Sequence, residues 1–202
     1  MRDDDRTDDR RKFLRRWAVL PIVLTLPVSK SSAAEAQELT PTPACSDGEE
    51  PTLRQMEGPF FKPRSPQRTS LLTAGLQGNR ILVSGLVLST RCTPVVGALL
   101  DFWQCDGQGE YDNSGYRLRG HQFTDSAGSY HLETIVPGVY PGRTRHIHVK
   151  VQAPGRAVLT TQLYFPGEPE NQHDFLFQQE LLLMTTDAGS VRAGRFDFVL
   201  KV

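Results

Sequence analysis

The sequence predicts an all-β protein, an antiparallel β-sandwich of about eight strands with little helix. From residue 80 onward, short segments rich in β-branched and aromatic residues alternate with turns of Gly, Pro, Asp and Asn, a spacing typical of sandwiches and barrels. Only Pro169–Glu180 has a helical pattern, and that segment is short. The sequence contains no internal repeat and no phosphate-binding glycine loop.

The predicted strands follow one another at short intervals. They are, in order, 81–88, 97–105, 116–124, 130–135, 146–153, 159–165, 181–185 and 195–202. In the last of them, Phe196, Phe198, Leu200 and Val202 would share one face, because side chains alternate along a strand. Together these strands predict one domain, residues 57–202, of a size that buries a single core.

The first 36 residues differ in composition from the rest. A basic region, Arg10–Arg16, precedes an apolar run, Trp17–Val28, and a stretch of small residues that ends at Ala36; these are the three parts of a secretory signal. The paired arginines followed by Phe-Leu resemble a twin-arginine signal. The apolar run is shorter than the ~20 residues that span a bilayer. We therefore expect residues 1–36 to be a signal peptide that directs export to the periplasm or extracellular space and leaves no stable membrane anchor.

The charge balance argues against a nucleic-acid partner. The chain has 23 Lys and Arg residues against 23 Asp and Glu residues, and the part after residue 36 is acidic by two charges. Binding to nucleic acid or to an anionic membrane surface needs a basic excess. Residues 37–56 are polar and rich in Thr and Pro, a composition that predicts a flexible N-terminal arm.

Three cysteines, Cys45, Cys92 and Cys105, follow the predicted signal. Disulfides persist in exported proteins, and an odd number leaves one thiol unpaired. Because Cys92 and Cys105 flank a short strand connection, we expect these two to pair.

The segment Met56–Pro63 carries two adjacent aromatic residues, Phe60 and Phe61, between prolines and a glycine. Such a segment is neither a central strand nor a helix. We expect its aromatic rings to pack on the core, and the alternative is that they form the wall of a pocket.

The predicted strand 146–153 contains a His-x-His motif. Its apolar residues would lie on one face, and His146 and His148 on the other. Two neutral imidazoles at these positions can hold one metal ion, because the backbone sets their separation. The same pattern also fits two half-exposed histidines on a solvated sheet face. The motif alone does not decide between these interpretations.

Two tyrosines occur in turns rather than in the middle of predicted strands. Tyr111 follows a glycine-rich loop, and Tyr140 lies in Pro137–Gly142, directly before Arg143. A free tyrosine has a pKa of ~10, so its oxygen binds metal at neutral pH only where a highly charged cation stabilises the phenolate.

Six segments of the chain resemble, in order, the intradiol ring-cleavage dioxygenases. They are Glu57–Phe61, the Pro94–Tyr111 hairpin with its Asp-Phe-Trp-Gln centre, Phe123–Gly128, Pro137–Pro141, Arg143–His148 and Thr161–Phe165. The resemblance covers about residues 57–168 and is to the protocatechuate 3,4-dioxygenase-like core. With the predicted signal, it places the chain in an exported subgroup.

The resemblance implies a mononuclear, non-haem Fe(III) centre. Its ligands would be Tyr111, Tyr140, His146 and His148. Tyr140 would also accept a substrate proton, Arg143 would stabilise charge on the substrate ring, and Gln162 would lie beside Arg143. The implied reaction inserts both atoms of O2 into a small aromatic diol and cleaves the bond between the two hydroxylated carbons, giving a muconate-type dicarboxylic acid.

Some features leave alternatives open. Arg145 adds a second cation beside the expected site, and the remaining histidines, His121, His131 and His173, fit surface or structural roles. A non-catalytic exported binding module would have no tightly held metal. A copper or zinc protein would need further nitrogen, sulfur or carboxylate ligands. Any homo-oligomer would use the sandwich or its arm.

Overall fold

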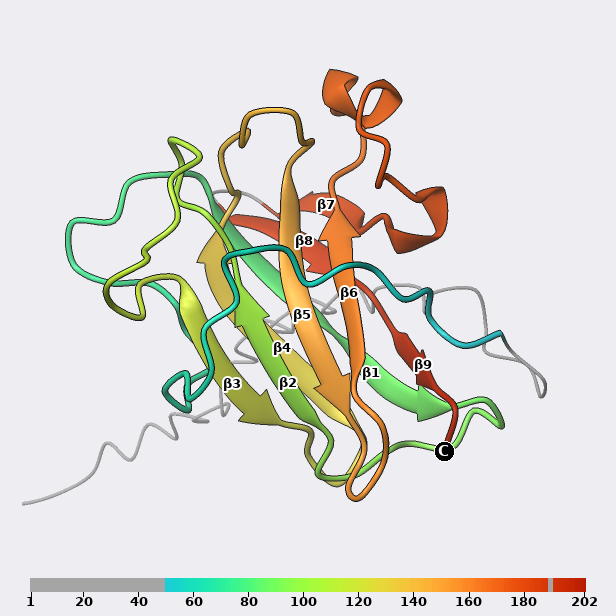
Figure 1. Ribbon diagram of the computed structural model, residues 1–202. Coiled ribbons are helices and arrows are strands. Elements are labelled where there is room, and N and C mark those ends of the chain that lie inside the picture. Colours follow the sequence, from blue (N-terminus) through green and yellow to red (C-terminus); the bar gives the residue numbers. More distant parts are fainter. Residues whose placement is uncertain (1–49, 189–190) are drawn as a thin grey trace, which may run out of the picture. The chain divides into compact units, whose positions relative to one another are not determined.

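The computed structural model describes residues 50–188 and 191–202 (Figure 1). The predicted signal peptide, most of the predicted arm and Cys45 lie outside the described residues. The strands are β1 (Arg80–Ser89), β2 (Leu99–Trp103), β3 (Arg119–Phe123), β4 (Ser129–Ile135), β5 (His146–Gln152), β6 (Leu159–Tyr164), β7 (Met184–Ala188), β8 (Val191–Arg195) and β9 (Phe198–Leu200). In this part of the chain no helix is long and apolar enough to cross a bilayer.

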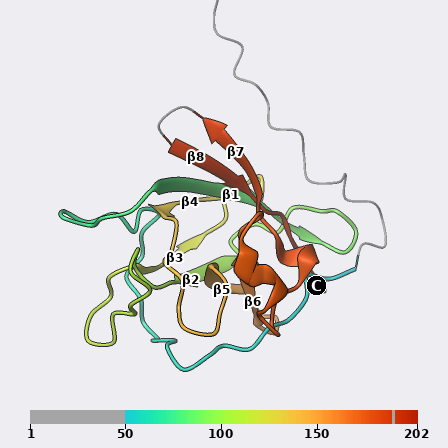
Figure 2. The same ribbon diagram turned by 90° about the horizontal axis from the view of Figure 1, so that it is seen from above.

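The strands form two packed sheets, which confirms the predicted sandwich. One sheet has the order β4-β1-β8-β7, with β9 also paired to β1, and the other has the order β3-β2-β5-β6. Figure 2 shows the two sheets as separate layers. Most neighbours are antiparallel, but β1 pairs in parallel with both β8 and β9. The five-stranded sheet is therefore mixed rather than purely antiparallel.

The main hydrophobic core lies between the sheets. From the four-stranded sheet it receives alternate residues of each strand, such as Leu100 and Phe102 of β2 and Ile147, Val149 and Val151 of β5, all with 0% exposure. Burying one such side chain contributes roughly 1.5–3 kcal/mol. This alternation leaves the other set of β5 side chains on the outer face of the sheet.

The N-terminal arm, residues 50–66, covers that outer face. Figure 1 shows it crossing in front of β6 and β5. The backbone N–H of Gln55 donates to the carbonyl of Thr160 on β6 (2.8 Å), and the Gln162 side chain donates to the carbonyl of Met56 (3.1 Å). Farther along, Arg119 Nη1 donates to the carbonyl of Phe60 (2.6 Å). The arm is thus bound to the sheet at several points.

The predicted closing strand 195–202 is wrong in its extent. Two strands, β8 and β9, occupy this end of the chain, and β8 was not predicted. At the break, the backbone carbonyl of Phe196 packs against Gly85 of β1, where a Cβ would lie 1.8 Å away. The Asp197 carboxylate accepts a hydrogen bond from Leu86 N–H (2.9 Å) in place of a ladder bond. The buried residues of the predicted face are Phe196, Phe198 and Leu200, whereas Val202 is exposed.

The helix predicted at 169–180 is also absent. The segment contains two short 3-10 turns, η1 (Pro169–Gln172) and η2 (Gln179–Leu181), and strand β7 begins at Met184 rather than at residue 181. Between the turns, Leu176 N–H donates to the Asp174 carboxylate, and the Leu176 carbonyl accepts from Tyr164 Oη. These backbone groups have tertiary partners and are not used for a continuous helix.

The expected disulfide between Cys92 and Cys105 is wrong. Cys92 is disulfide-bonded, but Cys105 is a free, buried thiol. Cys92 precedes the five-residue strand β2 and Cys105 follows it. The strand spans about 16 Å at ~3.3 Å per residue, whereas the Cα atoms of a disulfide lie within about 7 Å.

Candidate metal centre

Strand β5 begins at the residue that carries the first imidazole of the candidate site. His146 and His148 lie on the same outer face, and their Nε2 atoms are 3.0 Å apart. Both residues are 3% exposed. The structure therefore brings the two histidines together as the alternation predicts, on a face that is covered rather than half-exposed.

One hydrogen bond fixes the protonation of His146. Its Nδ1 lies 2.7 Å from the carbonyl oxygen of Thr144, which can only accept, so Nδ1 carries the proton. Its Nε2 then presents a lone pair toward His148 and Tyr111. Metal-binding histidines commonly have this arrangement, with the second ring nitrogen held by a carbonyl or carboxylate.

Tyr111 reaches the histidines from the β2–β3 connection. Its hydroxyl oxygen is 3.3 Å from Nε2 of His146. The first turn of this connection is closed by Asp106, whose carboxylate accepts hydrogen bonds from two backbone N–H groups of the loop, each 3.0 Å away. The structure thus brings Tyr111 to the histidine pair.

Tyr140 lies on the β4–β5 connection, which touches the β2–β3 connection at two glycines. A Cβ on Gly138 would lie 2.4 Å from the nitrogen of Gly109, and a Cβ on Gly109 would lie 2.4 Å from the carbonyl oxygen of Val139. Only glycine allows this approach. The half-buried ring of Tyr140 lies 5.8 Å from that of Tyr111, so the two predicted tyrosines are neighbours.

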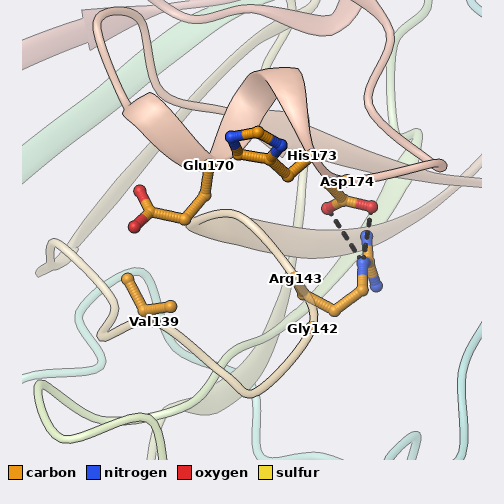
Figure 3. A pocket seen from close by; sticks show the side chains of 6 residues that line it. All are labelled: Val139, Gly142, Arg143, Glu170, His173 and Asp174. Atoms are coloured by element: carbon orange, nitrogen blue, oxygen red, sulfur yellow. Dashed lines mark hydrogen bonds and ion pairs between the residues drawn. The ribbon is translucent and has the colours of Figure 1, made fainter.

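Arg143 is held by side chains rather than surrounded by water. Its Nε lies 3.0 and 2.9 Å from the two carboxylate oxygens of Asp174, and its Nη2 donates to Gln162 Oε1 at 2.6 Å. Figure 3 shows the guanidinium facing Asp174 at one end of a cavity of about 130 Å³ that His173 and Glu170 also line. Gln162 is fully buried, and this hydrogen bond places it beside Arg143, as predicted.

Arg145 does not stand free beside the site. Its Nε pairs with Glu168 at 2.9 Å, and its Nη1 donates to the carbonyl of Pro137 at 2.5 Å. Its charge is therefore compensated locally. Of the remaining histidines, His121 contacts Ser65 through Nδ1, while His131 and His173 are exposed, which agrees with structural and surface roles.

Aromatic rings enclose the histidines and Tyr111. The ring of Trp103 stacks on His148 with centroids 4.8 Å apart, and Phe60 of the arm stacks on Tyr111 at 4.2 Å. Phe61 packs edge-on against Trp103. The arm aromatics thus pack on a small cluster beside the site, separate from the main core. They bury the site and at the same time form its wall.

Burial determines the charge states of these groups. Burial, aided by the positive charge of Arg143, lowers the pKa of His146 to about 4. Burial and the neighbouring imidazole lower the pKa of His148 well below its usual value. Burial also raises the pKa of the Tyr111 phenol. At neutral pH the imidazoles are therefore neutral, and Tyr111 ionises only if a cation binds beside it.

The donor atoms fit a single metal ion. Ligand atoms that lie about 2.0–2.1 Å from one ion are about 3 Å apart when the bonds meet at right angles, and the separations here are 3.0 and 3.3 Å. Among residues 50–188 and 191–202, no group of three or more His, Cys, Asp or Glu side chains could hold a metal. In this part of the chain the further donors beside the histidines are therefore phenols.

Comparison with known proteins agrees with this geometry. The sequence profile of a family described as Dioxygenase matches residues 56–202. The chain belongs to the intradiol ring-cleavage dioxygenase family. The match includes every candidate residue of the site, from the arm to Asp174.

Among the family members similar to this chain is a solved structure from Streptomyces sp. SirexAA-E. It is the dioxygenase domain of a dioxygenase carbohydrate-binding protein fusion, with 61% identity and a TM-score of 0.74, covering 76% of this chain and 99% of that one. Chlorocatechol 1,2-dioxygenase of Rhodococcus opacus is 30% identical over 58% of each chain. The protocatechuate 3,4-dioxygenase beta chain of Burkholderia cepacia is 31% identical, over 61% of this chain and 65% of the relative. The chain thus spans about 60% of the length of these two relatives.

Two residues of the site were not expected from the sequence. Asp174, whose side chain is 1% exposed, binds Arg143. Tyr164 Oη lies 3.1 Å from Gln162 Oε1 and 2.7 Å from Gln55 of the arm. Asp174 was missed because its segment was predicted to be helical. A signal was present, since the charged and amide residues before Asp174 leave that predicted helix without a clear apolar face.

Proposed function

We propose that this domain is a non-haem Fe(III) intradiol dioxygenase. It would insert both atoms of O2 into a catechol-type aromatic and cleave the bond between the two hydroxylated carbons, giving a muconate-type dicarboxylic acid. The observation that carries the proposal is the position of His146 Nε2, which lies 3.3 Å from Tyr111 Oη and 3.0 Å from His148 Nε2 among buried aromatic rings. The names of the relatives, which include chlorocatechol, catechol and hydroxyquinol dioxygenases, support it.

Four residues would hold the ion: Tyr111, Tyr140, His146 and His148. A bound ferric ion would supply a hard, highly charged Lewis acid that stabilises ionised phenols of both the protein and the substrate. The carbonyl of Thr144 keeps the proton of His146 on Nδ1, so Nε2 remains a donor. Tyr140, half-buried at the edge of the aromatic cluster, is suited to take up a substrate proton at its Oη.

The remaining residues shape the surroundings of the substrate. The guanidinium of Arg143 provides a fixed positive charge beside the site for the electron-rich diol. Phe60, Trp103 and their neighbours exclude water, which strengthens such electrostatic contacts. The atoms balance without a further reductant, because both atoms of O2 enter the product and the diol loses none of its own. The two hydroxylated carbons of the diol become the two carboxyl carbons of the dicarboxylic acid.

Oxygen labelling tests this function. The purified protein, loaded with iron, is supplied with catechol and ¹⁸O2, and the product is analysed by mass spectrometry. We expect a muconate that carries both labelled atoms. Tyr111→Phe should lose most of this activity, while Tyr116→Phe, which removes a hydroxyl bonded to the carbonyl of Pro63 outside the site, should keep it. A protein that retains no iron and cleaves no catechol-type diol would instead favour a non-catalytic binding module.

We also propose that the protein is exported through its twin-arginine-type signal. The arginine pair, Arg10 and Arg11, followed by a short apolar run and an Ala-x-Ala sequence supports this. Replacing both arginines with lysine should retain the protein in the cytoplasm in a cell-fractionation experiment. Unchanged export of that variant would contradict the twin-arginine route.

A further inference from the structure

We propose that Asp174 is a positioning residue for Arg143, and that it limits the positive charge that Arg143 offers to the dicarboxylate product. This inference rests on the proposed function. Asp174 lies between the two 3-10 turns, far from the motif residues in sequence. Its side chain is 1% exposed, and that of Arg143 is 14% exposed.

The contacts of Asp174 fix both the side chain and the backbone of the turn that carries Arg143. Its two oxygens accept from Arg143 Nε at 3.0 and 2.9 Å, and Oδ2 also accepts from Thr144 N–H at 3.0 Å. Oδ1 accepts from Leu176 N–H at 2.9 Å. One buried carboxylate therefore joins the turn before β5 to the segment after β6 (Figure 3).

These contacts use some of the N–H donors of Arg143 and leave others without a protein acceptor among the described residues. A guanidinium has five N–H groups in a rigid plane. Asp174 takes Nε–H, and Gln162 takes one proton of Nη2 at 2.6 Å, with Tyr164 Oη at a longer 3.4 Å. No described residue accepts from Nη1. Because the plane is held at Nε and Nη2, the Nη1 edge keeps one direction and stays available to a ligand.

The charge of Asp174 has a second consequence. The proposed reaction turns an uncharged diol into a dicarboxylate that is a dianion at neutral pH. An uncompensated arginine beside the site would bind such a dianion strongly in a medium of low dielectric constant. With Asp174 paired to it, Arg143 remains an oriented donor for the diol, but its attraction for the product is reduced.

A neighbouring ion pair offers a matched control. Arg145 and Glu168 belong to the same two segments and form the same kind of pair, 2.9 Å apart, but they are more exposed, at 31% and 20%. Arg145 makes no hydrogen bond to Gln162 or Tyr164. Glu168→Gln therefore removes a similar contact between these segments without acting on Arg143.

The test is a double-mutant cycle in the iron-loaded protein, with Asp174→Asn, Arg143→Gln, the double variant and Glu168→Gln. Iron content, the visible absorption band expected from tyrosinate bound to iron, and the thermal midpoint of unfolding are measured for each variant. We expect Asp174→Asn to lower kcat/KM for catechol about 10–100-fold, as is typical for residues that orient a contacting group. In the Arg143→Gln background the same change should have little further effect, because Asp174 acts through Arg143.

Product binding gives a readout that is independent of turnover. cis,cis-Muconate is titrated anaerobically and followed through the visible band. We expect Asp174→Asn to bind it several-fold more tightly than the wild type, and Glu168→Gln to bind it equally. If Asp174→Asn does not fold, Arg143→Lys replaces it. Arg143→Lys keeps the charge but lacks the planar fork, so we expect the same loss of kcat/KM.

The outcomes separate this inference from the proposed function. If the wild type cleaves catechol but the effects of Asp174→Asn and Arg143→Gln on kcat/KM simply multiply, or product affinity does not rise, the positioning role is overturned and the dioxygenase remains. Wild-type turnover by Arg143→Lys would likewise overturn it. If the wild type cleaves no diol, the proposed function fails and the positioning role fails with it.

Discussion

The two faces of strand β5 are both buried, but different parts of the chain bury them. On the inner face Ile147, Val149 and Val151 are fully covered by the opposite sheet. On the outer face His146 and His148 are 3% exposed because loops and the N-terminal arm lie over them; a Cβ on Gly58 of the arm would lie 3.6 Å from the ring of His148. The inner face stabilises the fold, whereas the outer face holds polar groups in a dry place where they can bind an ion.

The largest effect on stability is expected from removing a core side chain next to the inner face of β5. Phe102→Ala removes a fully buried ring of β2 and should lower the free energy of unfolding by about 3–5 kcal/mol. Chemical denaturation measures this loss, and the control is Phe123→Ala, at a ring that is 51% exposed. A loss no larger than that of the control would contradict the assignment of the core.

Acid should destabilise the metal-free protein through the histidines of the outer face. The folded-state pKa of His146 is about 4, below the unfolded value of ~6.5. Between these values only the unfolded state binds the proton, so stability falls as pH decreases from about 6.5 to 4, by about 3 kcal/mol for this residue. His148 shifts in the same direction.

Denaturation of the metal-free protein across this pH range measures the effect. His146→Gln should reduce the dependence of stability on pH, whereas His173→Gln, at an exposed ring, should leave it unchanged. Stability that is constant from pH 6.5 to 4 would show that the imidazoles are not buried as described.

A substitution where the two site loops touch should have a smaller effect on stability than on the site. Gly138→Ala places a Cβ 2.4 Å from the nitrogen of Gly109, and such overpacking costs about 1–3 kcal/mol. Because the two loops carry Tyr111 and Tyr140, we expect the visible band and the ring-cleavage activity to fall much more than stability. Gly194→Ala on β8, whose nearest contact is a flexible side-chain end at 3.3 Å, should leave the band unchanged. Equal losses in the two variants would contradict this.

The smallest effect is expected at the rim of the outer face. Lys150 pairs with Glu57 of the arm, but the two side chains are 22% and 44% exposed, and such pairs contribute about 0–1 kcal/mol. Lys150→Met should therefore change the free energy of unfolding by less than about 1 kcal/mol and leave the visible band intact. A colourless variant would mean that the contacts of Lys150 with Glu57 and with the ring of Phe61, and not the hydrogen bonds of Gln55 and Gln162, fix the arm.

The two faces of β5 differ in how far local sequence predicts them. Strands β1 to β6 follow from local alternation, and the shared face of His146 and His148 follows from their spacing. The covering of that face could not be predicted from local sequence, because Gln55 donates to the carbonyl of Leu176 and Gln162 donates to that of Met56, each across more than 100 residues. The contacts of Asp174 with the site could not be read locally either, since Arg143 and Thr144 lie 31 and 30 residues away in the sequence. The pairing of Cys92 was misjudged because β2 separates it from Cys105.

The visible spectrum of the purified protein, recorded with iron quantified on the same sample and with catechol added under anaerobic conditions, tests the central claim most directly. We expect about one iron per chain, a tyrosinate-to-iron band that shifts when catechol binds, and a changed band in Tyr111→Phe but not in Tyr116→Phe. A colourless protein that cannot be reconstituted with iron would contradict the assignment of Tyr111, Tyr140, His146 and His148 as a metal centre.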